Sequence, residues 1–461
     1  MINLSDYKKI HCIGIGGIGL SAIADILIER GYEVSGSDMK SGAMTEKLAS
    51  RGAKICIGHR AENVEDVDLV VYTVAISDEN PEFKRAKELG IPTMTRAQML
   101  GAIMGEYDYS IAISGTHGKT TTTSMVSLIL RNAKKDPTIA VGGNLPEIGG
   151  NVAVGTSPYF VTEACEYRDS FLSLKPTIEI ILNIDSDHLD YFKDIDHIVR
   201  SFNEFAALVP EDGYIIAYDA NPFVNSVVKE LPNVVTFGFA EGCTYAGSNI
   251  EFVGGMPKFT ISHEGKKLAD VQLSVPGEHN ILNSMAAFAC CHMLGVEVDT
   301  IVETLEEYHG TARRFDIQGK TKDGRLVVDD YAHHPTEIKA TLNAAKNVPH
   351  KDTWCLFQPH TYTRTLALFD EFADSFEDAD VVALAEIYAA REKNTYNISS
   401  KDLMREIKKH HPEKTVYYFD DMEKLAAFVY DNSLPEDIIL TMGAGDIYKA
   451  GEMILKWDKE K

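Results

Sequence analysis

The feature that most constrains this chain is the stretch from Ile111 to Thr123, where an apolar segment ends in a glycine-rich turn that carries one lysine. A helix-like segment follows the turn. A strand, a turn and a helix in this order direct the N–H groups of the turn and the positive end of the helix dipole at one point, which suits a phosphate group. The residues of this predicted phosphate cradle are Gly115, Thr116, His117, Gly118, Lys119, Thr120 and Thr121.

Lys119 and Thr120 are the residues of the cradle that carry chemistry. A lysine at this place supplies positive charge to the β- and γ-phosphates, and the threonine hydroxyl beside it can ligate Mg²⁺. The usual phosphate-binding loop has a glycine where this chain has Ile113, so the cradle is shorter. A turn that contains glycine and lysine without binding phosphate is the alternative, and the strand, turn and helix context argues against it.

A second glycine-rich turn follows the first predicted strand, and a helical run over residues 20–30 comes after it. The next predicted strand, residues 33–37, ends at Asp38, close to where a Rossmann domain places the acid that binds a ribose. The pattern predicts a site for a nucleotide diphosphate but leaves NAD, FAD and a nucleoside-diphosphate sugar open. Its residues are Gly14, Gly16, Gly17, Ile18 and Gly19, in the pattern G-x-G-x-x-G.

Two predicted strands of the middle region end in polar side chains. One covers residues 159–163 and ends at Glu163, and the other covers residues 178–184 and runs into His188. Because ligands gather at the carboxyl ends of the strands in a doubly wound sheet, we expect Glu163 and His188 to face the same phosphates. Together with Thr120 they are suitable ligands for Mg²⁺ or Mn²⁺. Taken singly, each has a simpler explanation, as a solvated strand end or a satisfied polar residue.

Asn280 and Asn283 lie one turn apart at the start of a predicted helix. They share a face of that helix, where their amides have the groups needed to read the edge of a purine. Ordinary capping of the helix explains them equally well, and spacing alone does not decide between the two.

The last third of the chain repeats one arrangement four times, a predicted strand that ends in chemically active or glycine residues. Predicted helices over residues 365–376 and 400–410 alternate with these strands, which indicates a parallel α/β domain. The residues at the four strand ends include Asp330, His333, His360, Arg364, Glu386, Arg391 and Gly445.

Length and composition set the organisation. A chain of 461 residues predicts about three domains, which we place at residues 1–105, 106–310 and 311–461. All three are predicted to be α/β: a Rossmann-like N-terminal domain that also contains a strand over residues 69–76, a central P-loop ATPase domain with a mainly parallel sheet, and a Rossmann-like C-terminal domain. The net charge of −24 argues against a partner nucleic acid.

The seven scattered cysteines lack metal-type spacing and indicate reduced thiols, and we find neither a cleavable leader nor an apolar run of membrane-spanning length. We therefore expect a cytoplasmic protein without membrane insertion. The oligomeric state is left open.

The motifs in their order along the chain resemble those of the Mur ligases, and the resemblance spans all three domains. The glycine-rich opening and the His-His-Pro run resemble most closely the branch that adds L-alanine to UDP-N-acetylmuramate. The residues that carry the resemblance are the cradle Gly115–Thr121, Glu163, Asp187-His188, His279-Asn280, Arg313–Phe315, Asp329–Pro335 and Gly443–Tyr448.

The resemblance implies an ATP-dependent amide ligase of peptidoglycan precursor synthesis that works through an acyl phosphate. The N-terminal domain would bind UDP-N-acetylmuramate, the middle domain ATP with Mg²⁺, and the C-terminal domain L-alanine. Lys119 would balance phosphate charge, Thr120 and Glu163 would hold one Mg²⁺, and His188 would hold a second.

The resemblance also assigns roles in the last two domains. Arg314 would reach the transferring phosphoryl group, and Asp330 would face the ribose. His333 and Arg364 would orient alanine and the acyl intermediate. The motif on the adenine side comprises His279, Asn280 and Asn283.

Two positions depart from the family pattern. Several relatives have a second arginine where this chain has Thr361, so clamping of the substrate carboxylate would rest on Arg364. Other Mur ligases hold the second metal with a carbamylated lysine, whereas residues 201–212 contain no lysine; the alanine-adding branch also lacks one.

Several alternatives remain from the sequence. The nearest is the recycling ligase that joins a whole tripeptide to the same UDP-sugar. Folylpolyglutamate synthases lack the N-terminal glycine pattern. A nicotinamide-dependent dehydrogenase would explain residues 14–38 only, and a regulatory UDP-sugar-binding protein would require that ATP is not turned over.

Overall fold

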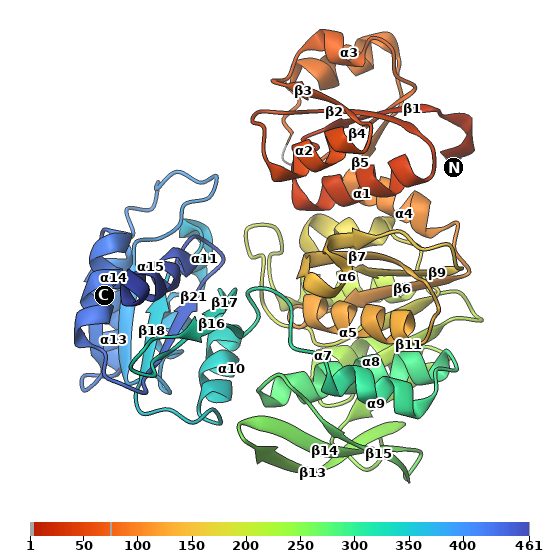
Figure 1. Ribbon diagram of the computed structural model, residues 1–461. Helices are drawn as coiled ribbons and strands as arrows, with labels where there is room; N and C mark the ends of the chain where they lie inside the picture. Colours follow the sequence, from red (N-terminus) through yellow and green to blue (C-terminus); the bar gives the residue numbers. More distant parts are fainter. Residues whose placement is uncertain (1–3, 74–75, 461) are drawn as a thin grey trace. The chain divides into compact units, whose positions relative to one another are not determined.

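The computed structural model describes residues 4–73 and 76–460 (Figure 1). The chain packs into two compact units, which we describe separately. The first comprises Met1–Ile184, Val199–Thr236 and Ala289–Glu297, and the second comprises Asp185–Ile198, Phe237–Phe288 and Val298–Lys461.

The N-terminal part of the first unit is a five-stranded parallel sheet with the order β3-β2-β1-β4-β5. Its strands are β1 (Lys9–Ile13), β2 (Glu33–Asp38), β3 (Lys54–Ile57), β4 (Leu69–Tyr72) and β5 (Thr93–Thr95). The helices are η1 (Leu4–Asp6), α1 (Ile18–Glu29), α2 (Ala43–Ser50), η2 (Ala61–Val64), α3 (Pro81–Leu89) and α4 (Arg96–Met104). The predicted Rossmann-like alternation is confirmed. The strand predicted over residues 69–76 ends at Tyr72, and residues 74–75 lie outside the described residues.

The rest of the first unit is built on a sheet with the order β12-β11-β10-β6-β9-β7-β8. Strand β6 lies between β10 and β9, pairs with both in parallel, and leads directly into the phosphate cradle. The strands are β6 (Tyr109–Ser114), β7 (Thr138–Leu145), β8 (Gly150–Ala153), β9 (Tyr159–Glu163), β10 (Ile178–Ile181), β11 (Tyr214–Tyr218) and β12 (Val234–Gly238). The helices are α5 (Lys119–Asn132), η3 (Pro146–Ile148), η4 (Tyr167–Ser173), α6 (Ile195–Ala206) and α7 (Pro222–Val228).

The second unit contains an antiparallel arrangement that we did not predict from the sequence. Strands β13 (Tyr245–Val253), β14 (Met256–His263) and β15 (Lys266–Gln272) form consecutive antiparallel pairs. Glycine-containing turns over residues 254–255 and 264–265 join them, and Gly254, Gly255 and Gly265 all have positive φ. Helix α8 (Glu278–Met293) follows, with its residues from Ala289 onward belonging to the first unit, and helix α9 (Val298–Glu306) comes next.

A six-stranded sheet forms the C-terminal part, with the order β16-β17-β21-β18-β19-β20 and only β16 antiparallel to its neighbour. The strands are β16 (Asp316–Lys320), β17 (Leu326–Asp330), β18 (Thr353–Phe357), β19 (Val381–Ala385), β20 (Thr415–Phe419) and β21 (Ile438–Met442). The helices are α10 (Pro335–Ala345), α11 (Tyr362–Ala367), α12 (Phe369–Ala373), α13 (Ser400–His410), α14 (Met422–Asn432) and α15 (Tyr448–Glu460).

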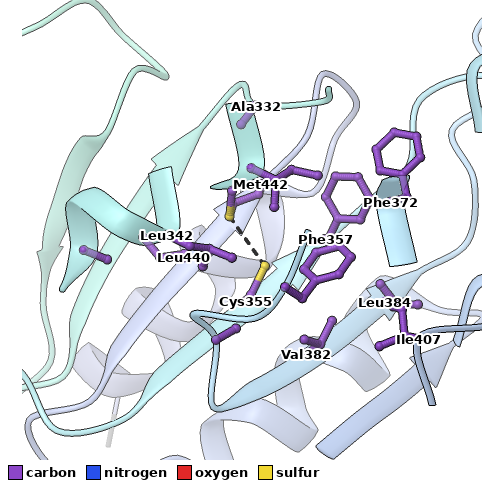
Figure 2. Close-up of a cluster of buried hydrophobic side chains, with 14 of the residues drawn as sticks. Ala332, Leu342, Cys355, Phe357, Phe372, Val382, Leu384, Ile407, Leu440 and Met442 are labelled. Atoms are coloured by element: carbon purple, nitrogen blue, oxygen red, sulfur yellow. Dashed lines mark hydrogen bonds between the residues drawn. The ribbon is translucent and has the colours of Figure 1, made fainter. Parts of the chain in front are cut away.

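Buried side chains alternate between the two faces of this C-terminal sheet. On one face Val328, Cys355 and Leu440 pack with Leu342 of α10 and Ile407 of α13 (Figure 2). On the other face the core is formed with residues of α14 and α15. Because both faces are covered by helices, the central strands β18, β19 and β21 are mostly apolar, and the candidate functional residues lie at strand ends.

The prediction of a single helix over residues 365–376 is wrong. The structure has two short helices there, α11 and α12, separated at Leu368, whose φ of −116° and ψ of 31° are not helical. Leu368 is buried in the core of the sheet face shown in Figure 2, so tertiary packing breaks a run that local sequence favours as one helix.

Among the described residues, no helix is both long enough and apolar enough to cross a membrane.

Candidate functional site

The N-terminal glycine-rich loop lies between β1 and α1 and is tied to the end of β2. Gly14 has a φ of 85°, in the left-handed region that favours glycine. The Gly16 N–H donates to Oδ2 of Asp38 at 2.9 Å, and the Gly17 N–H donates to the Gly14 carbonyl at 3.2 Å. A Cβ on Gly19 would lie 3.0 Å from Cδ of Arg96, a residue that we did not select from the sequence. The structure thus places Asp38 against the loop itself.

The phosphate cradle joins β6 to α5, as predicted. Gly115 and Gly118 have φ values of 131° and 85°. A Cβ on Gly115 would lie 3.0 Å from Cβ of Leu182 and 3.1 Å from the Asn183 nitrogen, which is closer than ordinary packing allows. Both the backbone conformation and the approach of the chain after β10 therefore require glycine at Gly115.

Asn183 holds the cradle and was missed from the sequence. Its carbonyl accepts the Thr116 N–H at 3.1 Å, and its side-chain Oδ1 accepts the His117 N–H at 2.8 Å. Its Nδ2 in turn donates to the His117 carbonyl at 3.0 Å. The sequence contains one signal of this role, a single amide inside the apolar run over residues 178–184.

Lys119 is paired with Glu166, another residue that we did not select. Lys119 Nζ lies 3.0 Å from Oε2 of Glu166, and it donates to the carbonyls of Gly115 and Thr116. The two side chains are 16% and 3% exposed. Burial lowers the pKa of Lys119, but the charge and hydrogen bond of Glu166, together with the nearby Cys165 and Glu163, outweigh burial and raise the pKa above its ordinary value. The cradle therefore carries a positive charge at neutral pH.

Glu163 ends β9, as predicted, and its Oε1 accepts the Gly142 N–H at 2.5 Å. Thr120 is the second residue of α5 and is buried. A further carboxyl lies inside the sheet: Glu179 of β10 is fully buried and accepts a hydrogen bond from Ser114 Oγ at 3.0 Å. Burial raises the pKa of Glu179 to about 8, so its carboxyl is protonated at neutral pH.

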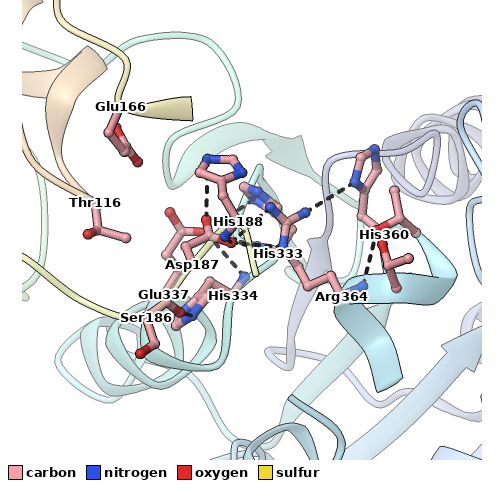
Figure 3. A network of polar contacts seen from close by, with 12 residues as sticks. Thr116, Glu166, Ser186, Asp187, His188, His333, His334, Glu337, His360 and Arg364 are labelled. Carbon is pink, nitrogen blue, oxygen red and sulfur yellow. Dashed lines mark hydrogen bonds and ion pairs between the residues drawn. The ribbon is translucent and has the colours of Figure 1, made fainter. Parts of the chain in front are cut away.

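In the second unit, Asp187 is the centre of a polar cluster (Figure 3). Its Oδ1 accepts hydrogen bonds from Nη2 of Arg364 at 3.0 Å and from Nε at 3.2 Å, while its Oδ2 lies 3.8 Å from Nε2 of His188. Burial raises the pKa of Asp187, but the positive charges of His188 and Arg364 outweigh burial and hold the pKa well below its usual range. His188 itself has a φ of 54°, a strained conformation for a residue that is not glycine.

The two adjacent histidines of the His-His-Pro run make different contacts. His333, which was predicted, has its Nδ1 3.0 Å from the Tyr331 carbonyl and 3.2 Å from Oε2 of Glu337. His334 was not among the predicted site residues. It caps α10 by accepting the Thr336 N–H on Nδ1, and its Nε2 donates to the Ser186 carbonyl at 2.9 Å. His334 therefore holds the segment that contains Asp187 and His188 (Figure 3).

Arg313 and Arg314 also differ. Arg313 is tied into the fold, because its Nε donates to Oδ2 of Asp329 at 2.8 Å and its Nη2 donates to the Gly443 carbonyl at 2.7 Å. The guanidinium of Arg314 lies over the Tyr331 ring, 5.3 Å from its centroid. The contacts of Arg313 indicate a structural role for it. Arg314 is the arginine that we selected from the sequence as a site residue.

Asp330 is buried at the end of β17, and both of its carboxyl oxygens accept backbone hydrogen bonds. Oδ2 accepts the Phe315 N–H at 2.9 Å, and Oδ1 accepts the Ala332 N–H at 2.7 Å. Burial raises the pKa of Asp330 to about 6, with the charge of Arg314 acting in the opposite direction. Each carboxyl oxygen of Asp330 therefore already accepts one hydrogen bond from the backbone of the protein itself.

At the start of α8, the Asn283 Nδ2 donates to Oδ1 of Asn280 at 3.1 Å, and the Asn280 Nδ2 donates to the Pro276 carbonyl at 2.7 Å. Neither bond is the acceptance of a helix N–H that defines an N-cap. Desolvation lowers the pKa of the neighbouring His279 to about 4, so its imidazole is neutral at neutral pH. A neutral ring and two ordered amides are suited to a heterocyclic base.

The structure thus gathers Asp187, His188, His333 and Arg364 in the second unit. Lys119, Thr120 and Glu163 belong to the first unit.

Comparison with known proteins identifies three consecutive family matches along the chain. Residues 9–108 match "Mur ligase family, catalytic domain", residues 113–291 match "Mur ligase middle domain", and residues 313–445 match "Mur ligase, glutamate ligase domain".

Two curated relatives align over essentially their whole length. The UDP-N-acetylmuramate–L-alanine ligase of Alkaliphilus metalliredigens is 51% identical over 97% of this chain and 97% of its own. The protein of the same name from Caldanaerobacter subterraneus subsp. tengcongensis is 50% identical over 100% of both chains.

Among solved structures, the UDP-N-acetylmuramate-alanine ligase of Thermotoga maritima aligns with a TM-score of 0.82 at 30% identity, covering 98% of this chain and 100% of its own. The murein peptide ligase of Psychrobacter arcticus aligns with a TM-score of 0.72 at 25% identity, covering 98% and 99%.

Proposed function

Because this chain belongs to the Mur ligase family, we propose that it is an ADP-forming ligase that joins L-alanine to UDP-N-acetylmuramate in peptidoglycan precursor synthesis. The observation that carries this proposal is the identity of about half of all residues, over the full chain, with curated ligases of that name. The lysine-bearing phosphate cradle supports the use of ATP.

The chemistry requires activation of a carboxylate, because oxide is a poor leaving group. Transfer of the γ-phosphoryl group of ATP to the lactyl carboxylate of the UDP-sugar forms an acyl phosphate and releases ADP. The amine of L-alanine then attacks the acyl carbon, phosphate leaves, and the amine loses a proton as the amide forms. Catalysis of the first step is mostly positioning and charge neutralisation.

In this proposal Lys119 neutralises the β- and γ-phosphates. Its pairing with Glu166 supports the role, because it keeps the ammonium group protonated until a phosphate competes for it. Thr120 and Glu163 would hold one Mg²⁺ and His188 a second, since hydroxyl, carboxylate and imidazole groups are suitable ligands for Mg²⁺ or Mn²⁺. When bound, such an ion would withdraw charge from the phosphate oxygens.

Other residues bind and orient the substrates. His279, Asn280 and Asn283 would contact the adenine, Asp330 the ribose, and Arg314 the phosphoryl group in transfer. His333 and Arg364 would orient alanine and the acyl intermediate. The glycine loop with Asp38 would hold the UDP group.

We also propose that residues 1–105, 106–310 and 311–461 are the three domains that bind the UDP-sugar, ATP and the amino acid in turn. The requirement for ATP and the free cysteines support a cytoplasmic location.

Phosphate release tests the function directly. The protein is incubated with Mg-ATP and UDP-N-acetylmuramate, and L-alanine, glycine, L-serine or the recycling tripeptide is added in parallel reactions. We expect release that depends on L-alanine. Release with the tripeptide alone would move the protein to the recycling branch, and no release with any amine would refute the ligase.

A further inference from the structure

The N-terminal sheet contains a buried carboxylate that the proposed reaction does not use. Glu82, the second residue of α3, has a fully buried side chain. Such a group is stable only when it is paired and hydrogen-bonded. Its Oε2 accepts the Ser37 hydroxyl at 2.6 Å and lies 3.0 Å from Nδ1 of His59, while its Oε1 accepts Nδ2 of Asn63 and lies 3.7 Å from Nε2 of His11.

These contacts keep the carboxylate ionised. Burial raises the pKa of Glu82, but the nearby His11 imidazole and the hydrogen bonds from Ser37 and Asn63 together outweigh burial and lower the pKa to about 2. At neutral pH, Ser37 therefore donates to a full negative charge, and hydrogen bonds of this kind are shorter and stronger than neutral ones. The 2.6 Å distance agrees with such a bond.

Ser37 is also the residue to which the glycine loop is attached. Its carbonyl accepts the N–H groups of Gly14 at 2.8 Å and of Ile15 at 3.0 Å. The next residue, Asp38, accepts the Gly16 N–H on its carboxylate. Three consecutive N–H groups of the loop are thus held by two consecutive residues at the end of β2.

His59 reaches the same place from the other side. It follows Gly58, whose N–H donates to the Asp38 carbonyl at 2.8 Å, and its ring contacts both Ser37 Oγ and Glu82. Glu82 therefore joins α3 and the segment after β3 to the two residues that shape the glycine loop. Displacement of Ser37 would move the loop without any direct contact between Glu82 and a ligand.

We propose that Glu82 is a positioning residue for the nucleoside diphosphate, which acts through Ser37 to hold the glycine loop in its binding conformation. This inference rests on the proposed function in one respect, that the glycine loop binds the UDP group of the substrate. A role in stability alone would leave the affinity of the folded protein unchanged.

The test compares Glu82→Gln and Ser37→Ala with the wild type and with Glu88→Gln. Glu88 is an exposed carboxylate on the same helix, so its substitution controls for the loss of one charge from α3. Calorimetry measures the dissociation constants of UDP-N-acetylmuramate and of ADP, kinetics measure KM and kcat for each substrate, and thermal unfolding measures stability. Ser37→Ala removes only the hydroxyl and keeps the carbonyl, which provides a milder variant if Glu82→Gln folds poorly.

We expect Glu82→Gln to weaken UDP-N-acetylmuramate binding roughly tenfold and Ser37→Ala to weaken it by a smaller factor, as expected for a lost hydrogen bond to a charge. KM for the UDP-sugar would rise, while KM for ATP and kcat at saturation would stay within about twofold. Glu88→Gln would match the wild type.

Equal affinity in folded Glu82→Gln, Ser37→Ala and wild type would overturn the inference, as would an equal loss of affinity for ADP and the UDP-sugar. Failure of the proposed function looks different, because the wild type itself would then not bind UDP-N-acetylmuramate. In that case UDP alone serves as the probe of the glycine loop, and the same comparison of variants decides the role of Glu82.

Discussion

Arg364 donates two hydrogen bonds to a single oxygen of Asp187, from Nη2 at 3.0 Å and from Nε at 3.2 Å, across 177 residues of sequence. Thr361, which stands where several relatives have an arginine, accepts the Arg364 N–H at 3.4 Å and so caps the helix that carries this guanidinium. The proposed clamp for a carboxylate substrate therefore already holds a carboxylate, next to the proposed metal ligand His188.

Arg364→Lys tests this arrangement. A lysine cannot donate through two nitrogens of a planar fork, so Asp187 would lose part of its compensation while remaining buried. We expect a loss of roughly 1–3 kcal/mol in unfolding free energy and a rise of about tenfold in KM for L-alanine. Urea unfolding and steady-state kinetics measure the two effects.

Arg405→Lys is the control for Arg364→Lys, because Arg405 is 69% exposed and pairs only with its helical neighbour Asp402 in the described structure. Wild-type stability and KM in Arg364→Lys would contradict the role of the ion pair.

Lys119→Met should slow turnover strongly while leaving the affinity for UDP-N-acetylmuramate unchanged. Loss of one charged donor at the transferring phosphoryl group lowers kcat by about a hundred- to a thousandfold. The variant also removes the ammonium group that pairs with the buried carboxylate of Glu166, so it should be less stable than the wild type. Phosphate release, calorimetry and thermal unfolding check the three expectations.

The double variant Lys119→Met, Glu166→Gln separates catalysis from stability. It also removes the negative charge that Lys119 balances, so we expect recovery of most of the lost stability without recovery of turnover. Recovery of turnover would mean that the lysine serves only to neutralise Glu166.

Gly16→Val should block the sugar nucleotide. A Cβ at Gly16 would lie 2.8 Å from Oδ2 of Asp38 and 3.2 Å from Cγ2 of Thr45, so the loop and the end of β2 would have to separate. We expect UDP-N-acetylmuramate to bind at least about tenfold more weakly, with ADP affinity retained. Gly42→Ala is the control, since a Cβ there meets nothing within 4 Å. Unchanged affinity in Gly16→Val by calorimetry would count against the assignment of the glycine loop.

Glu179 should make stability fall as the pH rises. Its pKa is raised by burial to about 8 in the folded protein, above the ordinary value of about 4.3 for an unfolded chain. Between these values the folded state binds the extra proton, so its contribution to stability is fully present below about pH 4 and is lost as the pH rises towards 8. Glu179→Gln mimics the protonated form and should remove this dependence.

Unfolding measured at pH 5.5 and 8.5 checks this expectation. The free energy of unfolding of Glu179→Gln, minus that of the wild type, should be roughly 1–3 kcal/mol larger at pH 8.5 than at pH 5.5. Glu204→Gln replaces an exposed carboxylate of α6 and should leave the free energy of unfolding unchanged at both pH values. A constant difference between Glu179→Gln and the wild type would show that Glu179 is ionised in the fold.

Most of the fold followed from local pattern. Apolar strands that alternate with helices gave the α/β class, and the glycines at 14, 115 and 118 marked turns that need positive φ. The antiparallel strands β13 to β15 were not predicted, although the glycine turns over residues 254–255 and 264–265 are a local signal for them. The break at Leu368 was not predicted because it depends on the packing of Leu368 in the core.

The amino-acid sequence alone determined where the candidate site residues lie along this chain: which turns carry glycine and lysine, and which strands end in acids, histidines and arginines. These are local properties of strand, turn and helix. Only the tertiary structure decided which side chains meet. The register that pairs Ile181 with Ser114 sets Asn183 beside the cradle, and the packing around Lys119 brings it Glu166. Such partners come from strand order and from the burial of charge, and neither is encoded within a single motif.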